Sequence, residues 1–375
     1  MTETNFMRRA AARRVHEILE VLESFFPSSL AEEWDRIGLQ VGSAAATVKR
    51  VGVALDPSPE AVRQTAGGLL VTHHPLLFHP LARLDTDTPV GATVAEAIRR
   101  RTAIVACHTN ADWAAGGVND VLAQRLGLLD VRPWEPLYPV AYRKLTVFVP
   151  ESHLAAVSEA VFQAGGGVIG NYAKCSYRLR GEGTYLPRAG ATPYSGRPGE
   201  LSVENEVRLE VRVPAANVTA VLEAMKATHP YEEVAFDLFP TERQNPAGGR
   251  GRLGRLPKPQ TLAALARWAA RRRRAPAGRF VGDGATRIER LLLCGGAGAG
   301  FIDALAGRPG DALLTGDLKY HEALQARERR VPVIDLGHFA TEYPFIESLA
   351  ARLTASLSPL PVFVCRTDSD PFSRI

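Results

Sequence analysis

Three short aliphatic runs of the chain, each typical of a buried strand, end in histidine residues. The runs are residues 69–72, 103–106 and 333–337, and the histidines that follow them are His73 with His74, His108 and His338. Imidazole is the commonest transition-metal ligand in proteins, and the end of a strand holds a side chain rigidly. These strand ends therefore predict a metal site, and the chain must fold so that they meet.

Carboxylates lie close behind two of these histidines. Asp112 follows His108 by four residues, and Glu342 follows His338 by four residues. Histidine and carboxylate together suit borderline divalent cations such as zinc, iron or manganese, and the sequence does not choose between them. We therefore expect five metal ligands: His73, His74, Asp112, His338 and Glu342.

Five ligands can hold two divalent ions only if a carboxylate or a water molecule bridges the ions. Two such ions contribute +4, the two carboxylates contribute −2 and neutral histidines contribute nothing, which leaves a formal charge of +2. This surplus favours a bound hydroxide and attracts an anionic substrate. The sequence thus predicts two-metal hydrolysis, in which hydroxide attacks an electrophilic carbon or phosphorus atom.

Two histidines are candidates for catalytic proton transfer, His108 and His321. His108 lies at a strand end, and His321 begins a predicted helix behind the strand-like run 312–316. Either imidazole could move a proton or hold a ligand in place. For His108, a hydrogen bond that orients Asp112 is an equally good interpretation. For Asp317, capping of the predicted helix is favoured over catalysis.

The bulk composition allows two or three domains with filled cores. The chain has 375 residues, 46% of them hydrophobic, and a formal charge of +5, which a solvated surface explains without nucleic acid. No apolar run approaches the roughly 18 residues that span a bilayer. The basic N-terminus leads into an amphipathic helix, with a transit peptide as the weaker alternative. Together with four cysteines that lack ligand spacing, this predicts a cytoplasmic protein with reduced thiols.

Strands and helices alternate along residues 51–108, which is typical of a parallel α/β sheet. A similar order recurs along residues 291–338. The segment ending at His73 aligns with the segment ending at Gly316, and the segment ending at His108 aligns with the one ending at His338. We therefore expect an α/β fold in which two related βα halves, from residues 1–140 and 246–375, form one discontinuous metal-binding domain.

The region between the halves has a repeat of its own. A strand and a helix over residues 144–163 recur over 207–227, at the offset that places Pro150 on Pro214. With further strands near 168–179 and 234–239, the order βαββαβ predicts an inserted ferredoxin-like α+β domain over residues 141–245. The Gly- and Pro-rich stretches 181–199 and 245–254 are expected to be a long loop and a linker.

Two other stretches have both a structural and a functional interpretation. The glycines within residues 295–300 could bring backbone amides to a phosphate, but the stretch lacks a P-loop lysine, so a tight strand-to-helix turn is favoured. The basic run Arg271 to Arg274 ends an apolar helix, where cations suit the helix dipole. A solvated surface is favoured there over a contact with nucleic acid.

Several motifs occur in one order along nearly the whole chain. They are Trp34-Asp35 to Gly42, Thr72-His73-His74-Pro75, His108-Thr-Asn-Ala-Asp112, Thr315-Gly316-Asp317 to His321, and Gly337-His338-Phe-Ala-Thr-Glu342, with Gly167 to Cys175 and His229 to Glu233 in the insert. Taken together they resemble the GTP cyclohydrolase 1 type 2 homologue family, the Nif-three-like dinuclear metal proteins. The resemblance implies that the five expected ligands bind two metals, that the chain forms a ring-shaped homohexamer, and that the insert is a PII- or CutA-like regulatory domain.

The residues and the resemblance together predict a metal-dependent hydrolase that acts on a nucleotide, such as GTP, or on a related small anionic substrate. The alternative is a metal-containing regulatory scaffold that binds nucleic acid or a partner protein without catalysis. Arg271 to Arg274 and the insert would support that alternative. Two residues depart from the family's usual pattern: Arg36 replaces an asparagine, and Trp113, which could reshape the pocket or stack on a base, replaces a small residue.

Overall fold

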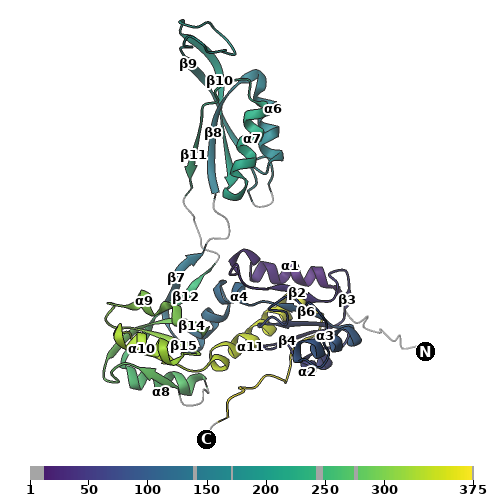
Figure 1. The fold of residues 1–375 in the computed structure, drawn as a ribbon, viewed down its shortest axis with the longest axis vertical. Helices are drawn as coiled ribbons and strands as arrows, with labels where there is room; N and C mark the ends of the chain where they lie inside the picture. Colours follow the sequence, from purple (N-terminus) through teal and green to yellow (C-terminus); the bar gives the residue numbers. More distant parts are fainter. Residues whose placement is uncertain (1–11, 138–141, 170–171, 242–247, 274–277, 374–375) are drawn as a thin grey trace, which may run out of the picture. The chain divides into compact units, whose positions relative to one another are not determined.

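The computed structural model describes residues 12–137, 142–169, 172–241, 248–273 and 278–373. The chain divides into two compact units, shown in Figure 1. Unit 1 comprises Met1–Pro139 and Pro246–Ile375, and unit 2 comprises Val140–Asn245. None of the described helices combines the length and the apolar character that a membrane span requires.

The first sheet of unit 1 has the strand order β17-β4-β5-β6-β2. Its strands are β2 (Gly38–Val41), β4 (Val51–Ala54), β5 (Leu69–Thr72), β6 (Ala103–Ala106) and β17 (Val362–Val364). The first four strands in this order run parallel, and β2 is antiparallel to β6. Every residue of β4, β5 and β6 is buried, because helices cover both faces of the sheet.

Alternate residues of β5 enter two different cores. Val71 packs in a cluster with residues of α1 (Val15–Phe25) and α11 (His338–Leu357), whereas Leu70 packs with α2 (Pro59–Gln64) and α3 (Pro89–Arg100). The helices begin where the sequence supplies caps: Ser58 and Thr88 accept hydrogen bonds from the backbone N–H groups of Ala61 and Gly91. The aliphatic runs thus became doubly covered parallel strands, as predicted.

The second sheet of unit 1 has the order β13-β16-β15-β14-β12-β7. Its strands are β7 (Leu129–Leu137), β12 (Gly248–Thr261), β13 (Arg279–Val281), β14 (Arg287–Ala297), β15 (Asp311–Gly316) and β16 (Val333–Asp335). The strands β14, β15 and β16 run parallel. The helices of this part are α5 (Val118–Leu126), α8 (Leu262–Arg273), α9 (Ile302–Leu305) and α10 (Tyr320–Glu328). A two-stranded pair joins β1 (Arg13–Arg14) to β3 (Thr47–Val48).

Helix α11 connects the two sheets of unit 1. It packs against β4 and β17 of the first sheet and against β14 and β15 of the second, and Figure 1 shows it between them. Its first residues press on the end of β15, because a Cβ added to Gly316 would lie 2.7 Å from the backbone nitrogen of His338. The start of α11 is therefore held where strands of both sheets end.

Unit 2 contains a four-stranded sheet with two helices on one face. In chain order its elements are β8 (Tyr142–Pro150), α6 (Leu154–Gln163), β9 (Ser176–Tyr185), β10 (Ser202–Pro214), α7 (Val218–Thr228) and β11 (Phe236–Pro240). The sheet order is β11-β8-β10-β9, and all neighbours are antiparallel. Alternate residues of β8 pack under α6 and α7 in one apolar core.

The long β9–β10 ribbon corrects two expectations about unit 2. The strand expected near residues 168–179 begins only at Ser176 and runs on to Tyr185. Gly181 and Gly183, expected in a loop, pair with Glu206 and Glu204 across the ribbon. Glycine is a weak local signal in a strand, and here the cross-strand pairing overrides it.

A buried arginine fixes the segment between α4 (Thr109–Trp113) and α5 to strand β12. Arg252 is 2% exposed, and its Nε lies 2.6 Å from Asp120 Oδ1. The guanidinium also donates to four main-chain carbonyls: those of Trp113, Ala114, Gly249 and Gly251. One side chain thus provides hydrogen bonds to main-chain carbonyls of two segments that are far apart in the sequence.

We expect the substitution Arg252→Met to lower the free energy of unfolding of unit 1 by about 3–5 kcal/mol, because it removes the charged partner of Asp120 and the buried guanidinium that donates to the four carbonyls. Chemical denaturation measures this loss. Arg255→Met is the matched control on the same strand, since its partner Asp130 is exposed; it should cost less than about 1 kcal/mol. Equal losses in the two variants would contradict the role given to Arg252.

Candidate metal centre

The five residues expected as metal ligands lie together in unit 1. His73 and His74 directly follow β5, and Asp112 lies in the short helix α4. His338 and Glu342 are four residues apart on α11, so both project from the same side of its first turns. Two groups of donor atoms, each within 4.8 Å of one another, are formed by His73, Asp112 and Glu342 and by His74, His338 and Glu342.

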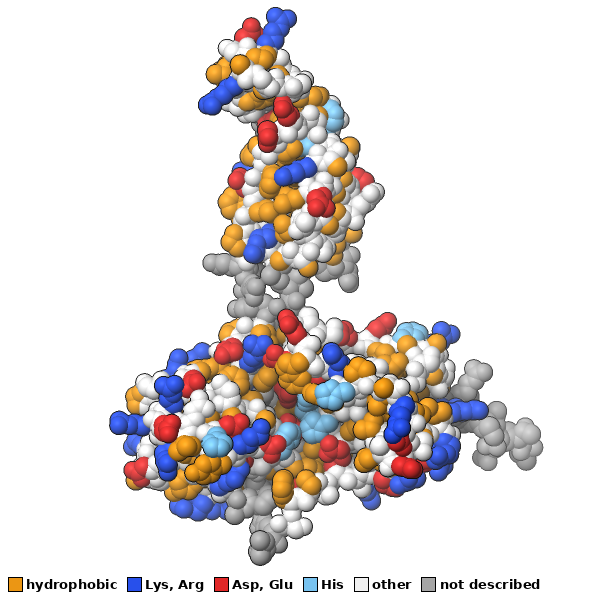
Figure 2. Space-filling model, in the orientation of Figure 1, with side chains coloured by type: hydrophobic (Ala, Val, Ile, Leu, Met, Phe, Trp, Pro, Cys, Tyr) orange, Lys and Arg blue, Asp and Glu red, His pale blue; other side chains and the backbone are white. Residues whose placement is uncertain are grey.

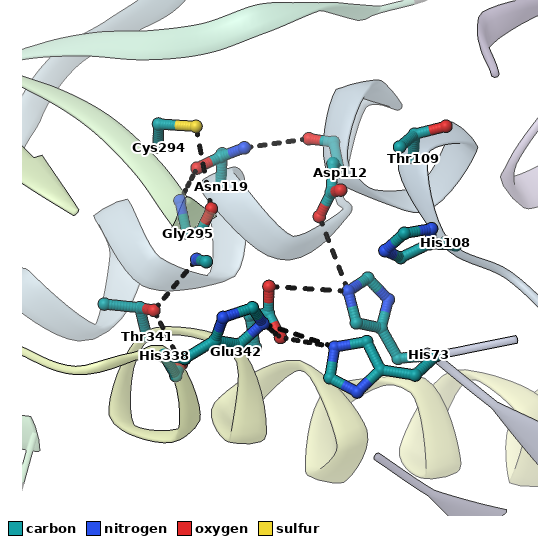
Figure 3. A network of polar contacts seen from close by, with 12 residues as sticks. His73, His108, Thr109, Asp112, Asn119, Cys294, Gly295, His338, Thr341 and Glu342 are labelled. Atoms are coloured by element: carbon teal, nitrogen blue, oxygen red, sulfur yellow. Dashed lines mark hydrogen bonds and ion pairs between the residues drawn. The ribbon is translucent and has the colours of Figure 1, made fainter. Parts of the chain in front are cut away.

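The first group is buried (Figure 3). His73 Nε2 lies 3.6 Å from Asp112 Oδ1 and 3.7 Å from Glu342 Oε1. The other ring nitrogen, Nδ1, lies 2.9 Å from the carbonyl oxygen of Cys107. A carbonyl can only accept, so Nδ1 carries the ring proton and the lone pair of Nε2 faces the two carboxylates.

This arrangement fits a cation. Within the described residues, His73 Nε2 and Asp112 Oδ1 are buried and have no hydrogen-bond partner, which is costly for polar atoms. Their separation is too long for a hydrogen bond. Two donors that each lie about 2.1 Å from a tetrahedral ion are separated by about 3.4 Å, close to the spacing here. A divalent cation among the three lone pairs would satisfy all of them.

The second group shares Glu342 with the first. His74 Nε2 lies 3.0 Å and His338 Nε2 2.9 Å from Glu342 Oε2, and the two ring nitrogens are 3.3 Å apart. Glu342 therefore offers Oε1 to one group and Oε2 to the other. Glu342 therefore has the position that a carboxylate shared between two ions would require.

Three carboxylates orient the other imidazoles from behind. Asp56 Oδ1 lies 2.7 Å from His74 Nδ1, Asp317 Oδ2 lies 2.7 Å from His338 Nδ1, and Asp35 Oδ1 lies 2.9 Å from His108 Nδ1. Such contacts fix the tautomer and direct Nε2 forward, as is common for metal-bound histidines. The expectation that Asp317 caps a helix is wrong, because α10 begins after Lys319.

Sequence reasoning missed Asp35 and Asp56 in this role. A signal existed for Asp56, since it follows β4, the parallel neighbour of the strand that leads to His74. Asp35 lies on a loop, and its carboxylate also accepts hydrogen bonds from the backbone N–H and the hydroxyl of Thr109. Only the folded chain brings that loop to β6.

The packing of the side chains sets the pKa values in the candidate centre. Burial lowers the pKa of His73, so that imidazole is neutral. Burial opposes protonation of His74, but hydrogen bonds to Asp56 and Glu342 outweigh it and raise the pKa to about 10. The hydrogen bond to Glu342 raises the pKa of His338 to about 9. Burial and the charge of Glu342 raise the pKa of Asp112. The negative charge of Glu342 thus favours positive charge at this point, which suits a cation-binding site.

The orienting carboxylates change the charge expected for a loaded centre. The five ligands and two divalent ions sum to +2, but Asp35, Asp56 and Asp317 bring the formal total to −1. An anionic group would therefore be held by direct contact with the ions rather than by a positive field around them.

The two predicted catalytic histidines are separated by the fold. One ring nitrogen of His108 lies within 4.8 Å of the donor atoms of His73 and His74. Its Nδ1 is held by Asp35, so the structure gives no side-chain contact through which it would orient Asp112. His321 is the second residue of α10, exposed, with its ring beside Tyr320, and it belongs to none of the donor groups among the described residues.

The residues given secondary interpretations lie as follows. Trp113 is buried and donates from Nε1 to Glu32 Oε1, so it does not provide an exposed face on which a base could stack.

Arg271 and Arg272 are exposed at the end of α8, and Arg274 lies outside the described residues. Strand β14 runs as far as Ala297, and Gly296, with φ of +64°, places its backbone against Glu342. That glycine lines the metal centre, a role the sequence did not suggest.

The two sheets, the helix between them and the clustered donors define an α/β protein with a candidate metal centre. The family model of Duf34/NIF3 (NGG1p interacting factor 3) matches residues 13–371, and the chain belongs to this family, as its motifs predicted.

Named relatives agree with this assignment. The chain is 38% identical over 366 residues to a GTP cyclohydrolase 1 type 2 homolog of Mycobacterium leprae, covering 96% of this chain and 95% of that protein. It is 35% identical over 364 residues to the homolog of Bacillus subtilis, covering 95% and 97%. A crystal structure of a Bacillus cereus protein related to NIF3 matches with a TM-score of 0.71 at 34% identity, over 97% of this chain and 99% of that one.

We expect Gly296→Ala to weaken metal binding, because the new Cβ would lie 2.3 Å from Glu342 Oε1 and the backbone is left-handed there. Elemental analysis of the purified variant, after dialysis against the metal, measures the loss. Gly300→Ala is the matched control in the following turn, since its Cβ would meet nothing within 4 Å. Full metal content in the Gly296 variant would contradict the role given to Gly296 as a residue that lines the metal centre.

Proposed function

We propose that unit 1 binds two divalent cations and that the chain is a metal-dependent hydrolase of a nucleotide or a related small anionic substrate. The observation that carries the proposal is the buried set of His73 Nε2, Asp112 Oδ1 and Glu342 Oε1, which lie close together although, among the described residues, neither His73 Nε2 nor Asp112 Oδ1 has a hydrogen-bond partner. When bound, divalent ions activate water for attack and polarise the group that is attacked.

The side chains divide the work of such a centre. His73 and Asp112 would hold one ion, His74 and His338 would hold the other, and Glu342 would offer one carboxylate oxygen to each. His108 is the candidate for proton transfer, because Asp35 fixes its Nδ1 and its ring centroid lies 5.2 Å from that of His73 and 5.7 Å from that of His74. His321 lies apart from this chemistry.

The relatives named GTP cyclohydrolase 1 type 2 homolog make purine nucleotides the first substrates to test. Their names are the support for GTP, whereas the support for hydrolysis is the donor set. An oxygen-rich group such as a phosphate suits the ions by direct contact.

We further propose that unit 2 is a ferredoxin-like insert of the PII or CutA type, in a cytoplasmic homohexamer. Its βαββαβ element order and antiparallel sheet support the fold, and the family motifs support the assembly. The alternative function, a metal-containing regulator without catalysis, is favoured by one observation: unit 2 has a cavity of about 450 Å³ of its own, lined by Phe148, Arg208 and Tyr231 among others.

We expect the protein loaded with zinc, iron or manganese to turn over at least one member of a panel of nucleotides and phosphoesters. Asp112→Asn should reduce that turnover by about 100-fold or more, since it removes a ligand charge without changing shape. The exposed Asp130→Asn is the control and should retain full activity. Turnover that survives in Asp112→Asn would indicate a contaminant, and no turnover in any sample would favour the regulator.

A further inference from the structure

Two exposed aromatic side chains stand beside the metal centre. Trp34 is 55% exposed and Phe78 is 41% exposed, and their ring centroids are 5.8 Å apart at an interplanar angle of 47°. The ring of Trp34 is also 6.2 Å from that of His108, and Phe78 follows His74 by four residues. On the face of unit 1 shown in Figure 2, histidines gather in a hollow with hydrophobic side chains beside them.

The backbone on both sides of Trp34 is firmly held, although the indole is not covered. Asp35 is buried, and its carboxylate accepts hydrogen bonds from His108, from Thr109 and from the backbone N–H of Arg36. Glu32, two residues before Trp34, accepts from Trp113 and pairs with Arg250, and its N–H donates to Thr109. Hydrogen bonds on both sides thus hold in place an indole that is 55% exposed and that lies next to the candidate metal centre.

We propose that Trp34 and Phe78 bind a planar aromatic ring of the molecule on which the metal centre acts. This inference rests on the proposed function and narrows its substrate class to small anions that carry such a ring. The ring contacts the indole while the oxygen-rich group of the same molecule reaches the ions. The hydrogen bonds of Glu32 and Asp35 hold the backbone on either side of Trp34, so less conformational entropy is lost when a ring binds there.

Guanosine 5′-monophosphate and ribose 5-phosphate test this inference, since they share a sugar phosphate and differ in the ring. The zinc-loaded full chain should bind the nucleotide more tightly, with quenching of tryptophan fluorescence. Trp34→Leu should reduce the affinity for the nucleotide about tenfold and remove the fluorescence quenching. The affinity of this variant for ribose 5-phosphate should stay within about twofold of that of the unsubstituted protein. Trp34→Phe should restore most of the affinity.

A matched pair of phenylalanines controls for general effects. Phe78→Leu should weaken nucleotide binding, whereas Phe280→Leu, which removes a phenyl ring that is 40% exposed elsewhere in unit 1, should not. Equal binding of the two phosphates, or an unchanged preference in Trp34→Leu, would overturn the aromatic site while leaving the hydrolase intact. A ring preference without turnover of any substrate would count against the hydrolase and support the aromatic site.

A second inference comes from the segment after β17. Asp368 Oδ2 accepts from the backbone N–H of Leu55 at 2.8 Å, and Oδ1 accepts from that of Asp56 at 3.3 Å. Asp56 in turn orients His74. We infer that Asp368 is a positioning residue for the ion held by His74 and His338, which rests on the proposed two-ion centre.

Competition with a chelator on the zinc-loaded protein tests this role. Asp368→Ala should lower the affinity for one of the two zinc ions about tenfold and leave the affinity for the other within about twofold. Asp368→Asn should have an intermediate effect. Asp370→Asn is the control, because its carboxylate accepts only from the nearby N–H of Phe372 in the described contacts. Unchanged affinities, or equal weakening of both ions together with a lower melting temperature of the metal-free protein, would show a merely structural role.

Discussion

The convergence of three lone pairs on one buried point is the constraint on which the structure of unit 1 depends. His73, Asp112 and Glu342 come from a strand end, a short helix and a long helix, and each has lost most of its contact with water. Burying polar atoms without partners costs free energy. The rest of the fold must therefore stabilise the positions of these three side chains. The doubly covered sheet, the buried Arg252 and the contacts of α11 supply that restraint.

Oxygen atoms behind the imidazoles of the candidate centre fix the orientation of these rings. The carbonyl of Cys107 and the carboxylates of Asp56 and Asp317 lie at Nδ1 of His73, His74 and His338, respectively. Asp317 has a φ of +51°, a conformation that aspartate adopts more easily than most residues. That backbone conformation places its carboxylate at Nδ1 of His338. Asp368 acts on His74 indirectly, because it accepts a hydrogen bond from the backbone N–H of Asp56.

Most of the fold around the site was predictable because it depends on local patterns. Continuous aliphatic runs became buried parallel strands, and the histidines at the strand ends came together. The partners of these histidines were not predictable, because Asp35 and His108 are 73 positions apart and their contact exists only in the folded chain. Trp113 and the glycines of β9 were misjudged for the same reason: burial and strand pairing are set by distant segments.

The attachment of α11 to both sheets links occupancy of the site to the cohesion of unit 1. A cation held by His338 and Glu342 would tie this helix to the segments that carry His73, His74 and Asp112. Binding that requires the folded state adds about 1.4 kcal/mol to stability for each tenfold excess of free ion over its dissociation constant. The lifetime of the protein in a cell would then follow the supply of the metal, and starvation for that metal would expose the chain to proteolysis.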